Sequence, residues 1–154
     1  MSGTIVAPAT APGQSAVALI RLSGPESLSV LRKVTRTDRV FAPREQVFCR
    51  LYDGEKVLDE ALVTYFPAPR SFTGEDVVEF AVHGSPYIRG RLLEVLCACG
   101  AEPARRGEFS YRAFLNGKMD LLEAQGLCDL ISAGNKAAHD LALSSLDGRL
   151  SEKL

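Results

Sequence analysis

The sequence predicts an α+β protein whose C-terminal part is entirely helical. Three observations lead to this prediction. Short apolar runs of strand length are bounded by Gly, Pro and polar residues, and other segments repeat apolar residues at spacings of three and four. From about residue 105 onward only the helical spacing remains. With 154 residues, 46% hydrophobic and 24% charged, the chain has the composition of a globular protein and not of a disordered one.

The first elements alternate between strand and helix. We expect strands over residues 4–7 and 16–22, separated by a loop rich in Pro and Gly over 8–15. A helix follows Pro25, because this proline fits a first helical turn and the apolar residues after it keep helical spacing. Its apolar positions are Leu28, Leu31 and Val34.

The middle of the chain predicts a hairpin, a loop, a strand and a second helix. Strands over 47–52 and 57–66 flank the turn residues Asp53 and Gly54. Two prolines and a glycine make 67–74 a loop, and 76–82 reads as a strand. Ser85 is the expected cap of a helix that has Pro86 in its first turn and ends at Gly100.

Helices complete the chain. After an extended piece at 101–104, we expect a short helix over 109–116 and a second over 121–133, which Asp120 and Glu123 begin as a capping box. The last helix carries an apolar stripe that ends with Leu146, Leu150 and Leu154, and we expect this stripe to pack on another chain. The predicted domains are therefore residues 1–118, which are α+β, and residues 119–154, which open a helical domain.

Composition excludes several classes of protein. No apolar run approaches the roughly 18 to 20 residues of a membrane span, so we expect a cytoplasmic protein with no membrane partner. The net charge is only −1, yet residues 1–50 hold seven Lys and Arg against three Asp and Glu, and residues 51–100 hold four against eight. This is not the footprint of a protein that binds nucleic acid alone, but it allows a site of mixed charge. The four cysteines show no CxxC spacing and are expected to be reduced.

Neither a metal site nor a nucleotide-hydrolysing centre is predicted. The two histidines, His83 and His139, have no nearby ligand spacing. Gly117-Lys118 lacks the rest of a phosphate-binding loop, because Arg112 stands at the position of its first glycine and Met119 at that of its Ser or Thr. No catalytic residue is assigned either, because the sequence contains no nucleophile motif.

One arginine and one cluster of acidic residues are candidates for binding. Arg21 interrupts an apolar strand, where a guanidinium is costly unless it meets an anion, although a solvent-facing position explains it equally well. Glu75, Asp76 and Glu79 cluster near another strand, and a carboxylate there suits a ligand that presents an N–H beside an amino group, such as guanine, a pterin or an amidinium-like group. A solvated strand face is the alternative. Spacing alone does not select Lys118, which is expected in a turn between helices.

Three segments resemble the MnmE/TrmE family of tRNA-modification GTPases. They read TIVAPATAPGQSAVALIRLSGP (4–25), FPAPRSFTGEDVVEFAVHGSP (66–86) and RRGEFSYRAFLNGKMDLLEAQGLCDLI (105–131). The resemblance implies a tetrahydrofolate-binding domain of the aminomethyltransferase type, with a mixed or antiparallel sheet and helices, that dimerises and binds 5-formyl-tetrahydrofolate. It places the folate contacts on Arg21, Glu79 and Lys118. Ser15 and Ser85 depart from the family, which commonly has glycine at both positions.

The resemblance also implies a role in a larger enzyme. With an FAD-dependent partner, MnmG, the family installs an aminomethyl-type group at C5 of the wobble uridine of certain tRNAs. GTP, Mg²⁺ and K⁺ belong to a GTPase domain that these 154 residues do not contain, so we expect a piece of a longer protein. Two alternatives stay open: a purely structural dimerisation module whose folate pocket is degenerate, and a free-standing folate-dependent one-carbon transferase.

Overall fold

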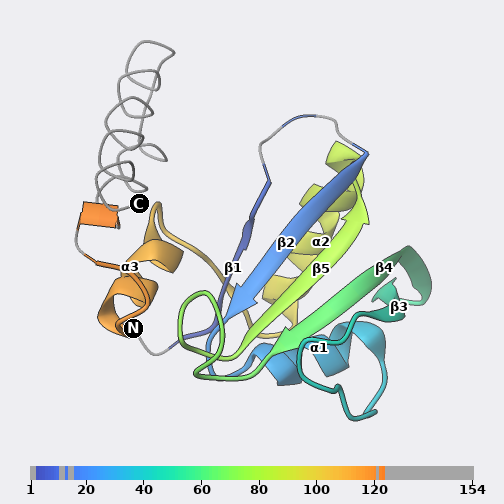
Figure 1. Cartoon of the computed structure of the whole chain (residues 1–154). Coiled ribbons are helices and arrows are strands. Elements are labelled where there is room, and N and C mark those ends of the chain that lie inside the picture. The colour runs from blue at the N-terminus through green and yellow to red at the C-terminus, as the bar shows by residue number, and fades with distance from the viewer. Residues whose placement is uncertain (1–2, 11–12, 14–15, 121, 124–154) are drawn as a thin grey trace. The chain divides into compact units, whose positions relative to one another are not determined.

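The computed structural model describes residues 3–10, 13, 16–120 and 122–123. The chain divides into two compact units, one formed by Met1–Ser71 and Glu75–Pro103 and the other by Phe72–Gly74 and Ala104–Leu154. The first unit holds the whole sheet and two of the helices (Figure 1). The α+β prediction is confirmed.

Six strands make one mixed sheet in the order β3-β4-β5-β2-β1-β6. All neighbouring strands are antiparallel except β1 and β6, which are parallel. The strands are β1 (Ile5–Pro8), β2 (Val17–Ser23), β3 (Val47–Asp53), β4 (Lys56–Phe66), β5 (Val77–His83) and β6 (Glu102–Pro103). Each of them lies within two residues of a predicted extended segment, because alternating apolar runs between turn residues fix strand positions well.

Two helices cover one face of the sheet. They are α1 (Ser27–Thr35) and α2 (Pro86–Ala98), and Figure 1 shows α2 behind β2 and β5. The core between helices and sheet takes alternate strand residues such as Ile20, Leu22 and Phe80, all fully buried. Since strand side chains alternate between faces, the residues between these point to the opposite, open face of the sheet.

The starts of both helices are fixed by hydrogen bonds. Ser85 caps α2 as predicted, because its hydroxyl accepts a bond from the amide of Ile88 at 3.4 Å. The Thr4 hydroxyl accepts from the amide of Glu26, the residue before α1, at 2.7 Å. Gly24, two residues before Glu26, has a φ of +138°, and a Cβ there would stand 2.6 Å from the Cα of Thr4. Only glycine fits this close approach.

The second unit contains α3 (Glu108–Leu115), also near its predicted position. The amide of Lys118 closes this helix by donating to the carbonyl of Ala113 at 2.8 Å, after Gly117 at a φ of +72°. The amide of Glu123 donates to the Asp120 carboxylate at 2.8 Å, which is half of the predicted capping box. The domain boundary at residue 118 stays a prediction, and the last helix, with Leu146, Leu150, Leu154 and His139, lies outside the described residues.

Within the described ranges, no helix is both long and apolar enough to span a membrane. Cys49, Cys97 and Cys99 are free thiols, as expected, whereas Cys128 lies outside the described residues. Burial raises the pKa of the thiols of all three described cysteines, which makes them poor nucleophiles.

Candidate functional site

The structure brings Arg21 and Glu79 together on the open face of the sheet. The two residues lie opposite each other on the paired strands β2 and β5, although 58 positions separate them in the sequence. Arg21 Nε donates to Glu79 Oε2 at 2.9 Å, and Arg21 Nη2 lies 2.8 Å from the same oxygen. Each side chain keeps 21% of its surface exposed. The charge that interrupts strand β2 therefore faces a carboxylate on the side away from the helices.

The geometry of this pair leaves one acceptor in position for a ligand. Both contacts end on Oε2 of Glu79, and among the described residues Oε1 accepts no hydrogen bond. A carboxylate carries about four lone-pair sites, so the Arg21 contact uses only part of its capacity. The guanidinium also restricts the rotation of Glu79. The result is an oriented carboxylate on a half-buried surface.

Small and apolar neighbours surround the pair. Thr64 and Ala7 flank it in the same row across the sheet, one on β4 and one on β1. The adjoining row toward one end is apolar and consists of Phe48, Leu62, Ala81 and Leu19. Phe48 and Leu62 are 63% and 42% exposed. A few oriented polar groups in an apolar setting are typical of sites that bind small molecules.

The other two acids of the predicted cluster have structural partners. Glu75 Oε1 accepts from the hydroxyl of Ser23 at 2.7 Å, and Asp76 Oδ1 accepts from the amide of Ala68 at 2.8 Å. Both contacts fix the loop that precedes β5. Glu79, the third of the clustered acids, meets the Arg21 guanidinium on the open face.

Lys118 lies in the second compact unit, exposed at the end of α3. Its convergence with Arg21 and Glu79 therefore stays a prediction. Ser85 has a structural use as the cap of α2, which explains a serine at this position without any contact to a ligand. Ser15 lies outside the described residues.

A carboxylate–histidine pair that the sequence did not predict lies at the far end of β5. Asp59, only 9% exposed, accepts from the amide of His83 at 2.9 Å and lies 2.7 Å from its ring Nδ1. The sequence did contain a sign of this pair. Asp59 alternates with Ala61 and Val63 along β4, so its side chain points to the same buried face of the sheet as theirs. A carboxylate on the buried face of a sheet is costly unless it is paired or hydrogen-bonded. The sequence predicted no metal-ligand role for His83 and gave it no other partner.

A second missed cluster ties the hairpin to α2. Arg91 donates through Nε and Nη2 to the two oxygens of Asp53, at 2.6 and 2.8 Å, and through Nη1 to Glu94 at 2.7 Å. The hydrogen bond from Arg91 is the main reason why the pKa of Asp53 falls below its ordinary value. Across the described ranges no three His, Cys, Asp or Glu side chains form a group suited to a metal ion.

A sheet with helices on one face and an oriented ion pair on the other defines an α+β domain. The chain belongs to the family described as "GTP-binding protein TrmE N-terminus", whose profile matches residues 4–118. The resemblance seen in the three sequence segments is thereby confirmed.

Several curated relatives named tRNA modification GTPase MnmE match nearly the whole chain. The protein of Alkalilimnicola ehrlichii is 52% identical over 146 residues, which cover 94% of this chain and 32% of that protein. The protein of Akkermansia muciniphila is 49% identical over 149 residues (94% and 33%), and that of Legionella pneumophila strain Corby 47% identical over 152 (98% and 34%). The chain thus spans about a third of the length of these relatives.

Proposed function

We propose that this chain binds 5-formyl-tetrahydrofolate on the open face of its sheet, as the one-carbon carrier for a tRNA modification. The observation that carries the proposal is the half-buried contact between Arg21 and Glu79. Membership of the TrmE N-terminal family supports it. In this proposal Glu79 is the primary acceptor, while Arg21 and Lys118 meet oxygens or carboxylates of the cofactor.

The chemistry of the pterin edge fits an oriented carboxylate. A reduced pterin presents a ring N–H beside an amino group, and one carboxylate accepts from both in parallel. The pterin ring has apolar faces, which suit Leu19 and Ala81 in the neighbouring row on the same two strands. Arg21 holds the Glu79 side chain in place for this contact. Hydrogen bonds to a charged acceptor contribute roughly 1.5 to 3 kcal/mol each.

Calorimetric titration with 5-formyl-tetrahydrofolate tests the proposal. The unchanged chain is expected to bind, and Glu79→Ala to bind at least about tenfold more weakly, which is the loss of one charge-assisted bond. Glu60→Ala is the matched control, since Glu60 is an exposed glutamate on the neighbouring strand whose ion pair with Arg50 is 4.0 Å long. No binding by the unchanged chain favours the structural dimerisation module instead. Binding that Glu79→Ala leaves intact refutes the role of Glu79.

The wider role follows from the relatives and belongs to the same proposal. Within a longer protein, residues 1–118 act as the folate and dimerisation domain, and residues 119–154 begin a helical domain that carries a GTPase domain. GTP, Mg²⁺ and K⁺ bind there. An FAD-dependent partner of the MnmG type completes a cytoplasmic enzyme that adds an aminomethyl-type group at C5 of the wobble uridine.

Dimerisation is proposed to use an apolar part of the open face, where Val17 and Leu62 are 57% and 42% exposed. Exposed apolar residues that lie together favour contact with a second copy. Sedimentation of the chain is expected to give a dimer, and Leu62→Asp to give a monomer with an unchanged circular dichroism spectrum. A chain that remains monomeric at high concentration contradicts this part of the proposal.

A further inference from the structure

The ion pair of Arg21 and Glu79 presents three hydrogen-bonding groups in a fixed order. Arg21 Nε donates to Glu79 Oε2 at 2.9 Å, and Arg21 Nη2 lies 2.8 Å from the same oxygen. Oε2 therefore stands between Oε1 and the guanidinium. A guanidinium carries five N–H groups, and Arg21 holds Glu79 through those on Nε and Nη2. Along this line the pair offers a ligand two acceptors and then a donor.

The sheet keeps this order fixed. Arg21 and Glu79 are opposite each other on β2 and β5, which are interior strands with a neighbour on either side. Ile20 and Phe80, next to them in sequence, are fully buried on the helical side. A slip of the register by one residue would turn these buried side chains out into water. The two acceptors and the donor are thus held by the rigid part of the fold.

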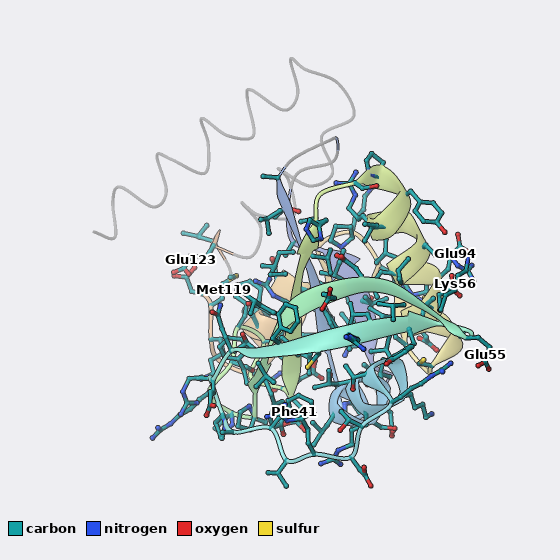
Figure 2. The ribbon with its side chains drawn as sticks, turned by 90° about the vertical axis from the view of Figure 1, so that its right-hand side faces the viewer. Phe41, Glu55, Lys56, Glu94, Met119 and Glu123 are labelled. Atoms are coloured by element: carbon teal, nitrogen blue, oxygen red, sulfur yellow. The ribbon has the colours of Figure 1, made fainter. Side chains whose placement is uncertain are left out.

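The surface beside the pair suits the flat face of a ring. Leu19 and Ala81 form the next row on the same two strands, and Thr64 is opposite Glu79 on β4. These three neighbours are uncharged. Figure 2 shows β3 and β4 on the side of the sheet nearest the viewer, with the turn residues Glu55 and Lys56 at one end. A ring over the uncharged row can therefore turn its polar edge toward the ion pair.

Three kinds of ring differ in how their polar edges match this order. A 2-amino-4-oxo ring, as in pterin or guanine, presents an amino group, a ring N–H and a carbonyl oxygen, which is donor, donor, acceptor. A 2,4-dioxo ring, as in lumazine or uracil, sets an oxygen against Glu79 Oε1. A neutral 2,4-diamino ring sets a bare nitrogen against Oε2 and an amino group against Arg21. Such mismatches leave polar groups without partners, and this is how binding sites reject close analogues.

We propose that Arg21 and Glu79 together select a 2-amino-4-oxo ring, with Arg21 as the residue that recognises the oxygen at position 4. The inference rests on the proposed folate function and specifies it. Glu79 accepts from the amino group and the ring N–H, Arg21 donates to the carbonyl, and the amino group lies on the side away from Arg21. A uracil-type base does not fit, so this pair binds the one-carbon carrier and not the base that the proposed reaction modifies.

Glu79→Gln is expected to reverse the preference between two rings that differ only at position 2. The Arg21 guanidinium only donates, so it must face the amide oxygen, and the amide NH₂ then takes the place of Oε1. The order becomes donor, acceptor, donor, which matches a 2,4-dioxo ring. In titrations followed by ligand fluorescence, the unchanged chain should bind pterin-6-carboxylate at least about tenfold more tightly than lumazine-6-carboxylate. Glu79→Gln should bind the lumazine more tightly.

Arg21→Leu tests the donor. Sulfur accepts hydrogen bonds weakly, so the unchanged chain should bind the 4-thioxo analogue of pterin-6-carboxylate at least about fivefold more weakly than the 4-oxo compound. Arg21→Leu should bind the two compounds alike, because the group that distinguishes them is gone. If Arg21 did no more than hold Glu79 in place, the variant would weaken both compounds by one factor. An unchanged ratio would therefore overturn the role of Arg21.

The pair of Arg50 and Glu60 supplies matched controls. These residues are also opposite each other on neighbouring strands, β3 and β4, with 4.0 Å between their charged atoms. Glu60→Gln and Arg50→Leu should leave both ratios unchanged, and a reversal in Glu60→Gln would contradict the inference. A chain that binds 5-formyl-tetrahydrofolate through Glu79 but treats the pterin and lumazine rings alike overturns the inference and leaves the folate proposal standing. A chain that binds neither the folate nor the rings contradicts both.

Discussion

Replacing Asp59 by alanine should destabilise the domain more than any change to an exposed acid. Asp59 is 9% exposed and accepts two bonds from His83, one from the backbone amide at 2.9 Å and one from the ring at 2.7 Å. The His83 side chain is 72% exposed, so water replaces the ring contact at little cost. The backbone bond joins the end of β5 to β4, and a bond to a charged acceptor contributes roughly 1.5 to 3 kcal/mol. We therefore expect Asp59→Ala to lower the free energy of unfolding by about 2 kcal/mol.

Urea denaturation followed by circular dichroism measures this loss. For an m-value of about 2 kcal/mol/M, the midpoint of Asp59→Ala should fall by about 1 M. Glu60→Ala, one position along the same strand, removes only an exposed pair with 4.0 Å between its charged atoms and should stay within about 0.5 kcal/mol of the unchanged chain. Equal midpoints for Asp59→Ala and Glu60→Ala would refute the reasoning, because the Asp59–His83 contact would then contribute nothing.

Three further predictions concern backbone geometry and titration. Gly24→Ala should lower the free energy of unfolding by at least about 2 kcal/mol, because its Cβ would stand 2.6 Å from the Cα of Thr4; an unchanged melting temperature would contradict this. The lowered pKa of Asp53 means that its bond from Arg91 stabilises the fold above the ordinary carboxyl pKa and that this stability is lost as pH falls through the lowered value. Urea midpoints measured on the acid side should therefore fall less steeply in Arg91→Gln, and parallel curves would count against it. Burial raises the pKa of Cys49, so iodoacetamide should alkylate it more slowly in the folded chain than in urea, as mass spectrometry of the modified peptide would record; equal rates would disprove it.

The local elements were predictable because their signals are local. Gly24 and Pro25 mark the end of β2 and the start of α1, and Ser85 with Pro86 marks the start of α2. In each case a glycine conformation, a proline ring or a capping hydroxyl acts within a few residues. Such signals do not depend on the rest of the fold.

The site was only partly predictable, because it depends on pairing between distant strands. The phases of Arg21 and Glu79 along their strands were readable, since fully buried residues such as Ile20 and Phe80 stand beside them. Their register, which puts them in contact, is set by the whole sheet. The sequence left a solvent-facing Arg21 as an equal alternative, and the structure joins both descriptions: Arg21 lies on the open face and meets a carboxylate there.

The charge distribution along the sequence located the site less well than the alternation of buried and exposed residues along the strands. The sequence showed an excess of cations in residues 1–50 and predicted a site of mixed charge, but it gave no place for it. The structure separates two ion pairs, Arg21 with Glu79 on β2 and β5, and Arg50 with Glu60 on β3 and β4. This separation follows from the sheet order, which puts β2 in the interior of the sheet and β3 at its edge.

A crystal structure of this chain with 5-formyl-tetrahydrofolate tests the folate proposal most directly. We predict that the pterin N–H and amino groups will donate to the Glu79 carboxylate at about 2.7 to 3.0 Å, with Arg21 still in contact with that carboxylate. Electron density for the pterin on another surface, with Glu79 bonded to Arg21 alone, would contradict the account.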